Sequence, residues 1–169
     1  MKLVEALRGQ EIPEDIQKAL VLVDVPYLSF GGVLEHGQLV VHRELARDVK
    51  EIFTLLWEHK FPIEKVVPIV RYNWDDNSSM ADNNTSAFNY RVIAGTERLS
   101  NHSFGRAIDV NPLLNPYTGR DGKVVPLGAR YEPNTPGTIT QDIANIFLKR
   151  GWQWGGNWEF KDWQHFEKL

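Results

Sequence analysis

The sequence contains no cysteine, which excludes disulfide bonds and thiolate metal ligands. Any metal site in this chain must therefore use histidine, aspartate or glutamate side chains. The chain also has no excess of basic residues, since its net charge is −3. This charge argues against nucleic acid as a partner. No apolar run is long enough for a transmembrane helix, and no signal peptide is visible after Met1.

The length of 169 residues suits one domain with a core of its own. We expect a single domain over residues 1–169, in which residues 1–36 form an N-terminal extension packed on the rest, and we expect a monomer. Extended patterns occur at 21–30 (broken by Pro26), 38–42, 66–72, 87–93, 106–112 and 160–167. Strands and helices do not alternate regularly, which favours an α+β fold with a central antiparallel sheet flanked by helices.

Two segments carry the apolar spacing of amphipathic helices. Residues 43–60 contain an apolar stripe at helical spacing, which consists of Leu45, Val49, Ile52, Phe53 and Leu56. A second helix opens at Thr138-Ile-Thr-Gln141, which has the form of a capping box, and ends before Gly151. We interpret His59, near the end of the first helix, as a helix-terminal residue and not as a metal ligand.

The segment from Asn73 to Ser86 is polar and rich in aspartate and asparagine, which predicts a long loop. Long loops inside compact domains are usually functional or mobile. Calcium binding is one interpretation of such a loop. The segment lacks the glycine and the terminal glutamate of an EF-hand loop, which argues against it.

The chemistry of the chain is concentrated in residues 100–112. His102 and Asp109 lie seven positions apart, and on a flat strand they would point to opposite faces. We expect the chain to turn at Gly105, so that the imidazole lies beside the carboxylate on the following strand. This pair of ligands suits zinc and requires a third, for which His165 is the best donor.

These motifs resemble those of a known family. Ser100-x-His102-x-x-Gly105-x-Ala107-x-Asp109, followed by Asp162-x-x-His165-Phe166, is similar to the zinc peptidases of bacterial cell walls. These are the D-alanyl-D-alanine carboxypeptidases of the vancomycin-resistance type and the L-alanyl-D-glutamate endopeptidases of phage endolysins. The resemblance extends over residues 37–169. It implies a small Hedgehog/DD-peptidase-like α+β domain in which His102, Asp109 and His165 hold zinc.

The resemblance also implies a carboxylate three residues before the last ligand, which is Asp162. This carboxylate can act as general base towards water, provided that a turn or bulge separates it from His165. Aspartate at this position favours the endopeptidase branch. Arg91 is the candidate for stabilising the negative charge of the transition state, and a surface ion pair is its alternative role. Ser100 either binds substrate or caps the turn that holds His102.

The resulting hypothesis is a zinc peptidase that cleaves a bond involving a D-amino acid in peptidoglycan stem peptides, acting at the cell wall in the periplasm or outside the cell. The D,D-carboxypeptidase and L-Ala-D-Glu endopeptidase activities both remain open. One alternative is a non-catalytic, zinc-containing cell-wall-binding module of the same fold, although pure binding needs no base such as Asp162. Another is a zinc hydrolase that acts on a different amide.

Overall fold

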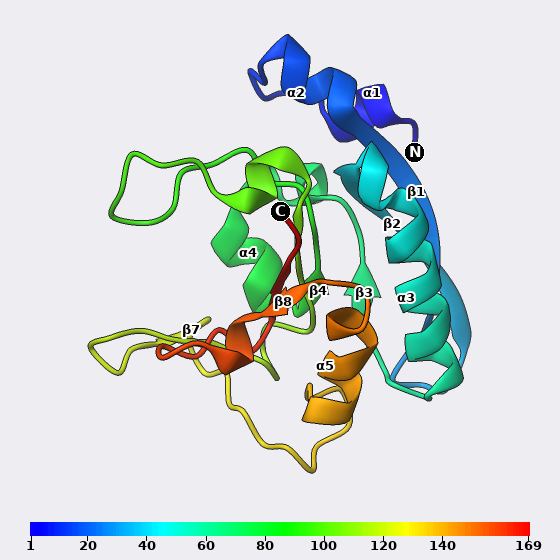
Figure 1. The fold of residues 1–169 in the computed structure, drawn as a ribbon, viewed down its shortest axis with the longest axis vertical. Coiled ribbons are helices and arrows are strands. Elements are labelled where there is room, and N and C mark those ends of the chain that lie inside the picture. The colour runs from blue at the N-terminus through cyan, green and yellow to red at the C-terminus, as the bar shows by residue number, and fades with distance from the viewer.

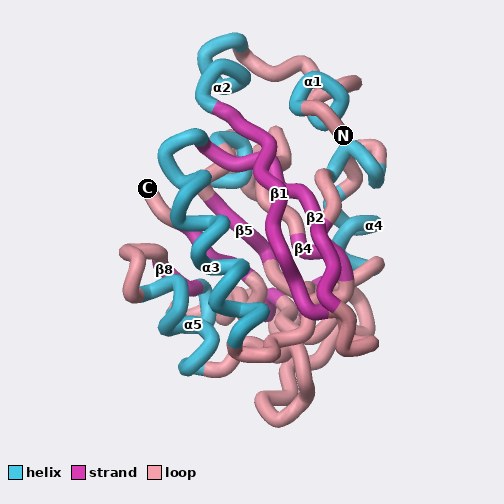
Figure 2. Tube along the Cα trace, turned by 90° about the vertical axis from the view of Figure 1, so that its right-hand side faces the viewer, coloured by secondary structure: helices cyan, strands magenta, loops and turns pink.

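The structure is a computed structural model that describes residues 1–169. Its longest paired element is a β-hairpin. Its strands β1 (Leu20–Leu28) and β2 (Leu34–His42) pair antiparallel over nine residues each, and Figures 1 and 2 show them running along one side of the molecule. The extended patterns predicted at 21–30 and 38–42 lie in these two strands, but Pro26 does not break the first one. Apart from one bridge between Leu28 and Pro62, β1 pairs only with β2, so the ring of Pro26 can be accommodated along the other, largely unpaired edge.

Helix α3 (Ala46–Glu58) follows a 3-10 turn at Arg43–Leu45 and packs against β1, as the two views show. Its buried face carries Val49, Ile52, Phe53 and Leu56, so the helix predicted from the apolar stripe is confirmed. His59 is the C-terminal cap, and its ring Nδ1 lies 2.8 Å from the carbonyl oxygen of Leu55.

The other predicted helix is α5 (Gln141–Leu148), which buries Ala144, Ile146 and Phe147. The predicted capping box is wrong, because Thr140 is the N-cap residue and its side chain accepts no capping hydrogen bond. Two short helices, α1 (Leu3–Ala6) and α2 (Glu14–Ala19), lie together at one end of the molecule (Figure 2). No helix of the structure combines the length and the apolar character needed to cross a membrane.

The predicted α+β class is confirmed, but the single central sheet is wrong. The remaining strands form three small sheets, each too short to extend the β1–β2 hairpin into one layer. They are the parallel pair β3 (Lys65–Val66) and β4 (Asn84–Thr85), the antiparallel pair β6 (Tyr117–Thr118) and β7 (Val124–Val125), and the three-stranded antiparallel sheet β5 (Ala107–Asp109), β9 (His165–Glu167) and β8 (Gln153–Trp154).

Three further predictions fail between residues 66 and 93. The predicted strand 66–72 is mostly a 3-10 turn, Ile69–Tyr72, which begins after Pro68. The predicted loop 73–86 contains helix α4 (Asp76–Ala81), because the Asp75 carboxylate accepts a hydrogen bond from the backbone N–H of Ser78 and caps the helix. Residues 87–91 form no strand, although Ala87 and Phe88 are buried.

Candidate functional site

Three elements bring His102, Asp109 and His165 together. His102 lies in a 3-10 turn, Asn101–Phe104, Asp109 ends β5, and His165 begins β9. Asp109 and His165 are directly opposite one another in the antiparallel β5–β9 pair. Opposed residues of such a pair point to the same face, so the pairing register alone brings this carboxylate beside this imidazole.

Gly105 supplies the turn that returns His102 to the same place, as predicted. Its φ of +64° is in the left-handed region, and a Cβ atom there would lie 2.5 Å from the backbone nitrogen of His42. The His42 N–H donates a 2.8 Å hydrogen bond to the Gly105 carbonyl, which holds the turn against β2. At the start of the turn, the Ser100 hydroxyl accepts a hydrogen bond from the His102 N–H over 3.3 Å, which is the capping role.

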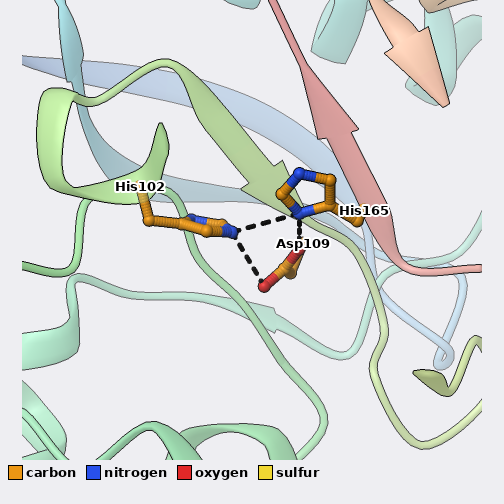
Figure 3. Close-up of side chains that lie close together, drawn as sticks. All are labelled: His102, Asp109 and His165. Atoms are coloured by element: carbon orange, nitrogen blue, oxygen red, sulfur yellow. Dashed lines mark hydrogen bonds and ion pairs between the residues drawn. The ribbon is translucent and has the colours of Figure 1, made fainter. Parts of the chain in front are cut away.

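The three side chains point toward one another at the ends of their elements (Figure 3). His102 Nε2 lies 3.1 Å from Asp109 Oδ2, and His165 Nδ1 lies 2.9 Å from Asp109 Oδ1. The two imidazole nitrogens are 3.2 Å apart. One donor atom from each residue lies within 4.8 Å of the others, and all three residues are buried.

In each of the two imidazole rings, one nitrogen faces the other candidate ligands (the inner nitrogen) and one points away from them (the outer nitrogen). The hydrogen-bond partner of the outer nitrogen determines which of the two nitrogens carries the proton. His102 Nδ1 faces the Ala87 carbonyl oxygen, and His165 Nε2 lies 3.1 Å from a Glu167 carboxylate oxygen that also accepts from Asn101 Nδ2 over 2.7 Å. A carbonyl or carboxylate oxygen can only accept, so each outer nitrogen carries a proton. In the neutral rings the inner nitrogens, His102 Nε2 and His165 Nδ1, then hold the lone pairs that a metal ion requires.

Charge in this cluster is balanced by close pairing. Burial alone would raise the pKa of Asp109, but the neighbouring imidazoles of His102 and His165 hold it well below its usual range. Burial opposes protonation of His165, yet hydrogen bonds to Asp109 and Glu167 raise its pKa to about 10. The carboxylates thus attract positive charge to the point where the three donors meet. Two imidazole nitrogens and one carboxylate oxygen form a donor set that fits a catalytic zinc site with a free coordination position.

Asp162 lines the same cavity of 340 Å³ as the three candidate ligands. Burial raises its pKa to about 6, and its Oδ1 atom is buried without a hydrogen-bond partner. The predicted turn before His165 is confirmed, since the His165 N–H donates to the Asp162 carbonyl over 3.2 Å. Gly155 permits this placement, because a Cβ there would lie 2.4 Å from the Asp162 carbonyl oxygen.

Arg91 also lines this cavity, from an irregular segment and not from the predicted strand. Its backbone N–H donates to Ser103 Oγ over 2.9 Å, and its carbonyl accepts from the Ser100 N–H over 3.0 Å. Its Nη2 atom lies 3.0 Å from Asp76 Oδ2, so the ion pair weighed as the alternative role exists beside the site.

Residues 94–168 match a family model described as D-alanyl-D-alanine carboxypeptidase. This segment is similar to that peptidase family. The resemblance inferred from the sequence motifs is therefore confirmed. The searches of curated proteins and of solved structures gave no match. The matched segment contains the three candidate ligands together with Ser100 and Asp162, whereas Arg91 lies before it.

The sequence analysis missed one residue of this candidate site, Glu167. Its carboxylate orients His165 and is itself held by Asn101. The signal was present in the sequence, because residues 165 and 167 share one face of a strand by its period of two. An acidic residue two positions after a histidine ligand is therefore able to reach the outer nitrogen of its ring.

Proposed function

We propose that this protein is a zinc metallopeptidase that hydrolyses an amide bond involving a D-amino acid in peptidoglycan stem peptides. The family match supports a peptidase of the D-alanyl-D-alanine carboxypeptidase type. The observation that carries the proposal is that three metal-ligating side chains and the carboxylate of Asp162 line one cavity.

His102, Asp109 and His165 would hold the zinc ion through Nε2, a carboxylate oxygen and Nδ1, respectively. Zinc bound in this way supplies Lewis acidity and lowers the pKa of water to about 7. The partners on Ala87 and Glu167 keep the two rings oriented, so the site needs little rearrangement when the ion binds.

Asp162 is the candidate general base. Its raised pKa of about 6 means that the carboxylate is ionised at neutral pH but still basic enough to accept a proton from water. The residue lines the cavity, and its Oδ1 forms no hydrogen bond within the protein that would compete for the carboxylate. The same group, once protonated, can deliver the proton to the leaving amine.

Arg91 is the candidate for stabilising the oxyanion of the transition state. The ion pair with Asp76 uses Nη2, while Nε has no partner in the protein. A guanidinium held in this way faces the cavity in a fixed orientation, which is what preorganised charge stabilisation requires. Ser100 contributes by capping the turn that carries His102, and it also lines the cavity.

The experiment is a digest of defined muropeptides with products mapped by mass spectrometry. We expect new free amines, their loss after chelation, and their return when zinc is added. The His102→Ala variant should be inactive and bind no zinc, while His59→Ala, at the exposed end of α3, is the matched control. Binding of cell-wall fragments without any cleavage would instead identify a non-catalytic module, and cleavage of generic peptides alone would identify a different amide hydrolase. The product map also separates carboxypeptidase from endopeptidase action.

A further inference from the structure

A second cavity continues from the metal-ligand cavity. It has a volume of 710 Å³, and the two cavities share Arg91, Ile93, Trp158 and Asp162 as lining residues. Because Asp162 lies between them, a peptide bound at the candidate base extends into the larger space. We call this larger space the groove.

One wall of the groove is the β6–β7 hairpin, which is attached to the segment that carries Asp162. The Thr118 N–H donates to the Lys161 carbonyl over 2.7 Å, and the Trp163 N–H donates to the Pro116 carbonyl over 3.2 Å. Tyr117 and Asp162 form a bridge between them. The hairpin is thus fixed relative to the candidate base, and so is Arg120, which follows two residues after Thr118.

Arg120 contributes an unpaired positive charge to the groove. Its guanidinium carbon lies 4.8 Å from the centroid of the Phe160 ring, and it forms no ion pair or side-chain hydrogen bond within the protein. By contrast, Arg91 in the same groove is paired with Asp76. Glu159 also lines the groove, and it forms no ion pair with Arg120.

We propose that Arg120 binds a carboxylate group of the peptide substrate in the groove. The cation–π contact with Phe160 restrains the guanidinium, and none of its N–H groups is used within the protein. A guanidinium binds a carboxylate through two parallel hydrogen bonds. The protein therefore selects acidic peptides, and a peptide that carries a carboxamide at the same position binds worse. This inference rests on the proposed function and specifies the substrate of that site.

The test is a comparison of kcat/KM for the zinc-loaded protein on three stem peptides. One has both an internal and a C-terminal free carboxylate, one is amidated at the internal position, and one is amidated at the C-terminus. We expect one of the two amidations to lower kcat/KM by about tenfold to hundredfold, mainly through KM, which is the range for a charged hydrogen-bonded pair. The position that matters identifies which carboxylate Arg120 binds.

The quantity compared between variants is the ratio of kcat/KM on the free peptide to kcat/KM on the amidated peptide. Arg120→Gln should reduce that ratio to about one. Arg120→Lys, which keeps the charge but loses the planar guanidinium, should retain part of it. Lys123→Gln is the matched control, since it removes one positive charge from the same hairpin at a position that does not line the groove. Equal melting temperatures establish that the variants are folded.

Distinct outcomes separate failure of this assignment from failure of the proposed function. If wild type cleaves all three peptides equally well, or if Arg120→Gln keeps the full ratio, the assignment of Arg120 is overturned while the proposed peptidase stands. An equal loss of the ratio in Lys123→Gln would reduce the effect to general charge and also overturn it. No cleavage of any peptide would overturn the proposed function and the assignment with it.

Discussion

The Asp162→Asn variant should lose activity while its stability acquires a different pH dependence. The substitution keeps the shape of the side chain and removes only its ability to ionise. Turnover should fall by about two to four orders of magnitude, the usual contribution of a general base, while zinc remains bound because Asp162 is not a ligand. The zinc content of the purified variant tests whether the ion stays bound, and turnover on muropeptides tests the loss of activity.

The stability effect follows from the burial of Asp162. Its pKa rises from 3.8 to about 6 in the folded protein because burial disfavours the charged form, which corresponds to about 3 kcal/mol. Between these two values the folded state binds more protons at this residue than the unfolded state does. The stability of wild type therefore falls as the pH rises through this window, and the variant is spared that loss.

Urea unfolding of the metal-free proteins at about pH 4 and about pH 7.5 tests this. Relative to wild type, the variant should gain about 2.5 kcal/mol on going to the higher pH, whatever constant offset its altered packing adds, because a small part of the wild-type loss has already occurred at pH 4. Asp142→Asn, at an exposed position of α5, is the control and should show no such change. A difference between Asp162→Asn and wild type that stays constant with pH, or normal turnover, would refute the reasoning.

Two further substitutions test the support of the metal site. Glu167→Ala should weaken zinc binding by about tenfold to hundredfold in competition with a chelating dye, because His165 loses the partner of its outer nitrogen, and Glu167→Gln, which still offers an acceptor, should lose less. An unchanged affinity in Glu167→Ala would show that the contact is incidental. Gly105→Ala should cost about 2 kcal/mol or more in urea unfolding and weaken zinc binding, because its Cβ would collide with the backbone of His42. Gly122→Ala, where φ is also positive but no atom lies within 4 Å, should show only the smaller backbone cost, and equal losses in the two variants would contradict this account.

The elements that the sequence predicted correctly have a strong local signal. Helix α3 has an apolar stripe along its whole length, and the β1–β2 hairpin has a glycine turn between two apolar runs. At the site, Gly105 marks the turn because no other residue fits its backbone conformation and the close approach of β2. These features depend on neighbouring residues, which a sequence shows directly.

The predictions that failed depended on partners distant in the chain or on weak local alternatives. The extended pattern at residues 87–93 does not produce a strand, because the backbone bonds singly to different elements: the Phe88 N–H donates to the Val40 carbonyl and the Asn89 N–H to the His102 carbonyl. The sequence predicts a loop in place of helix α4, because the cap of this helix, Asp75, belongs to a run of polar residues that is equally typical of loops. Short strands such as β3 and β4 have only two residues, too few for any period to be visible.

The candidate site was more predictable than the sheets. The ligating residue types are fixed by chemistry, and the motif around His102 gives their spacing, whereas the register that sets Asp109 opposite His165 emerges only in the fold. The contact of Arg120 with the ring of Phe160 joins residues far apart in the chain, so the sequence does not display it. The contact of Glu167 with His165 follows from a spacing of two on one strand and was open to prediction.

The most direct test of the central claim is a crystal structure of the zinc-loaded protein with anomalous data at the zinc edge. We predict one strong anomalous peak per chain, in contact with His102 Nε2, His165 Nδ1 and a carboxylate oxygen of Asp109. A peak at any other position, or no peak after zinc loading, would contradict the account.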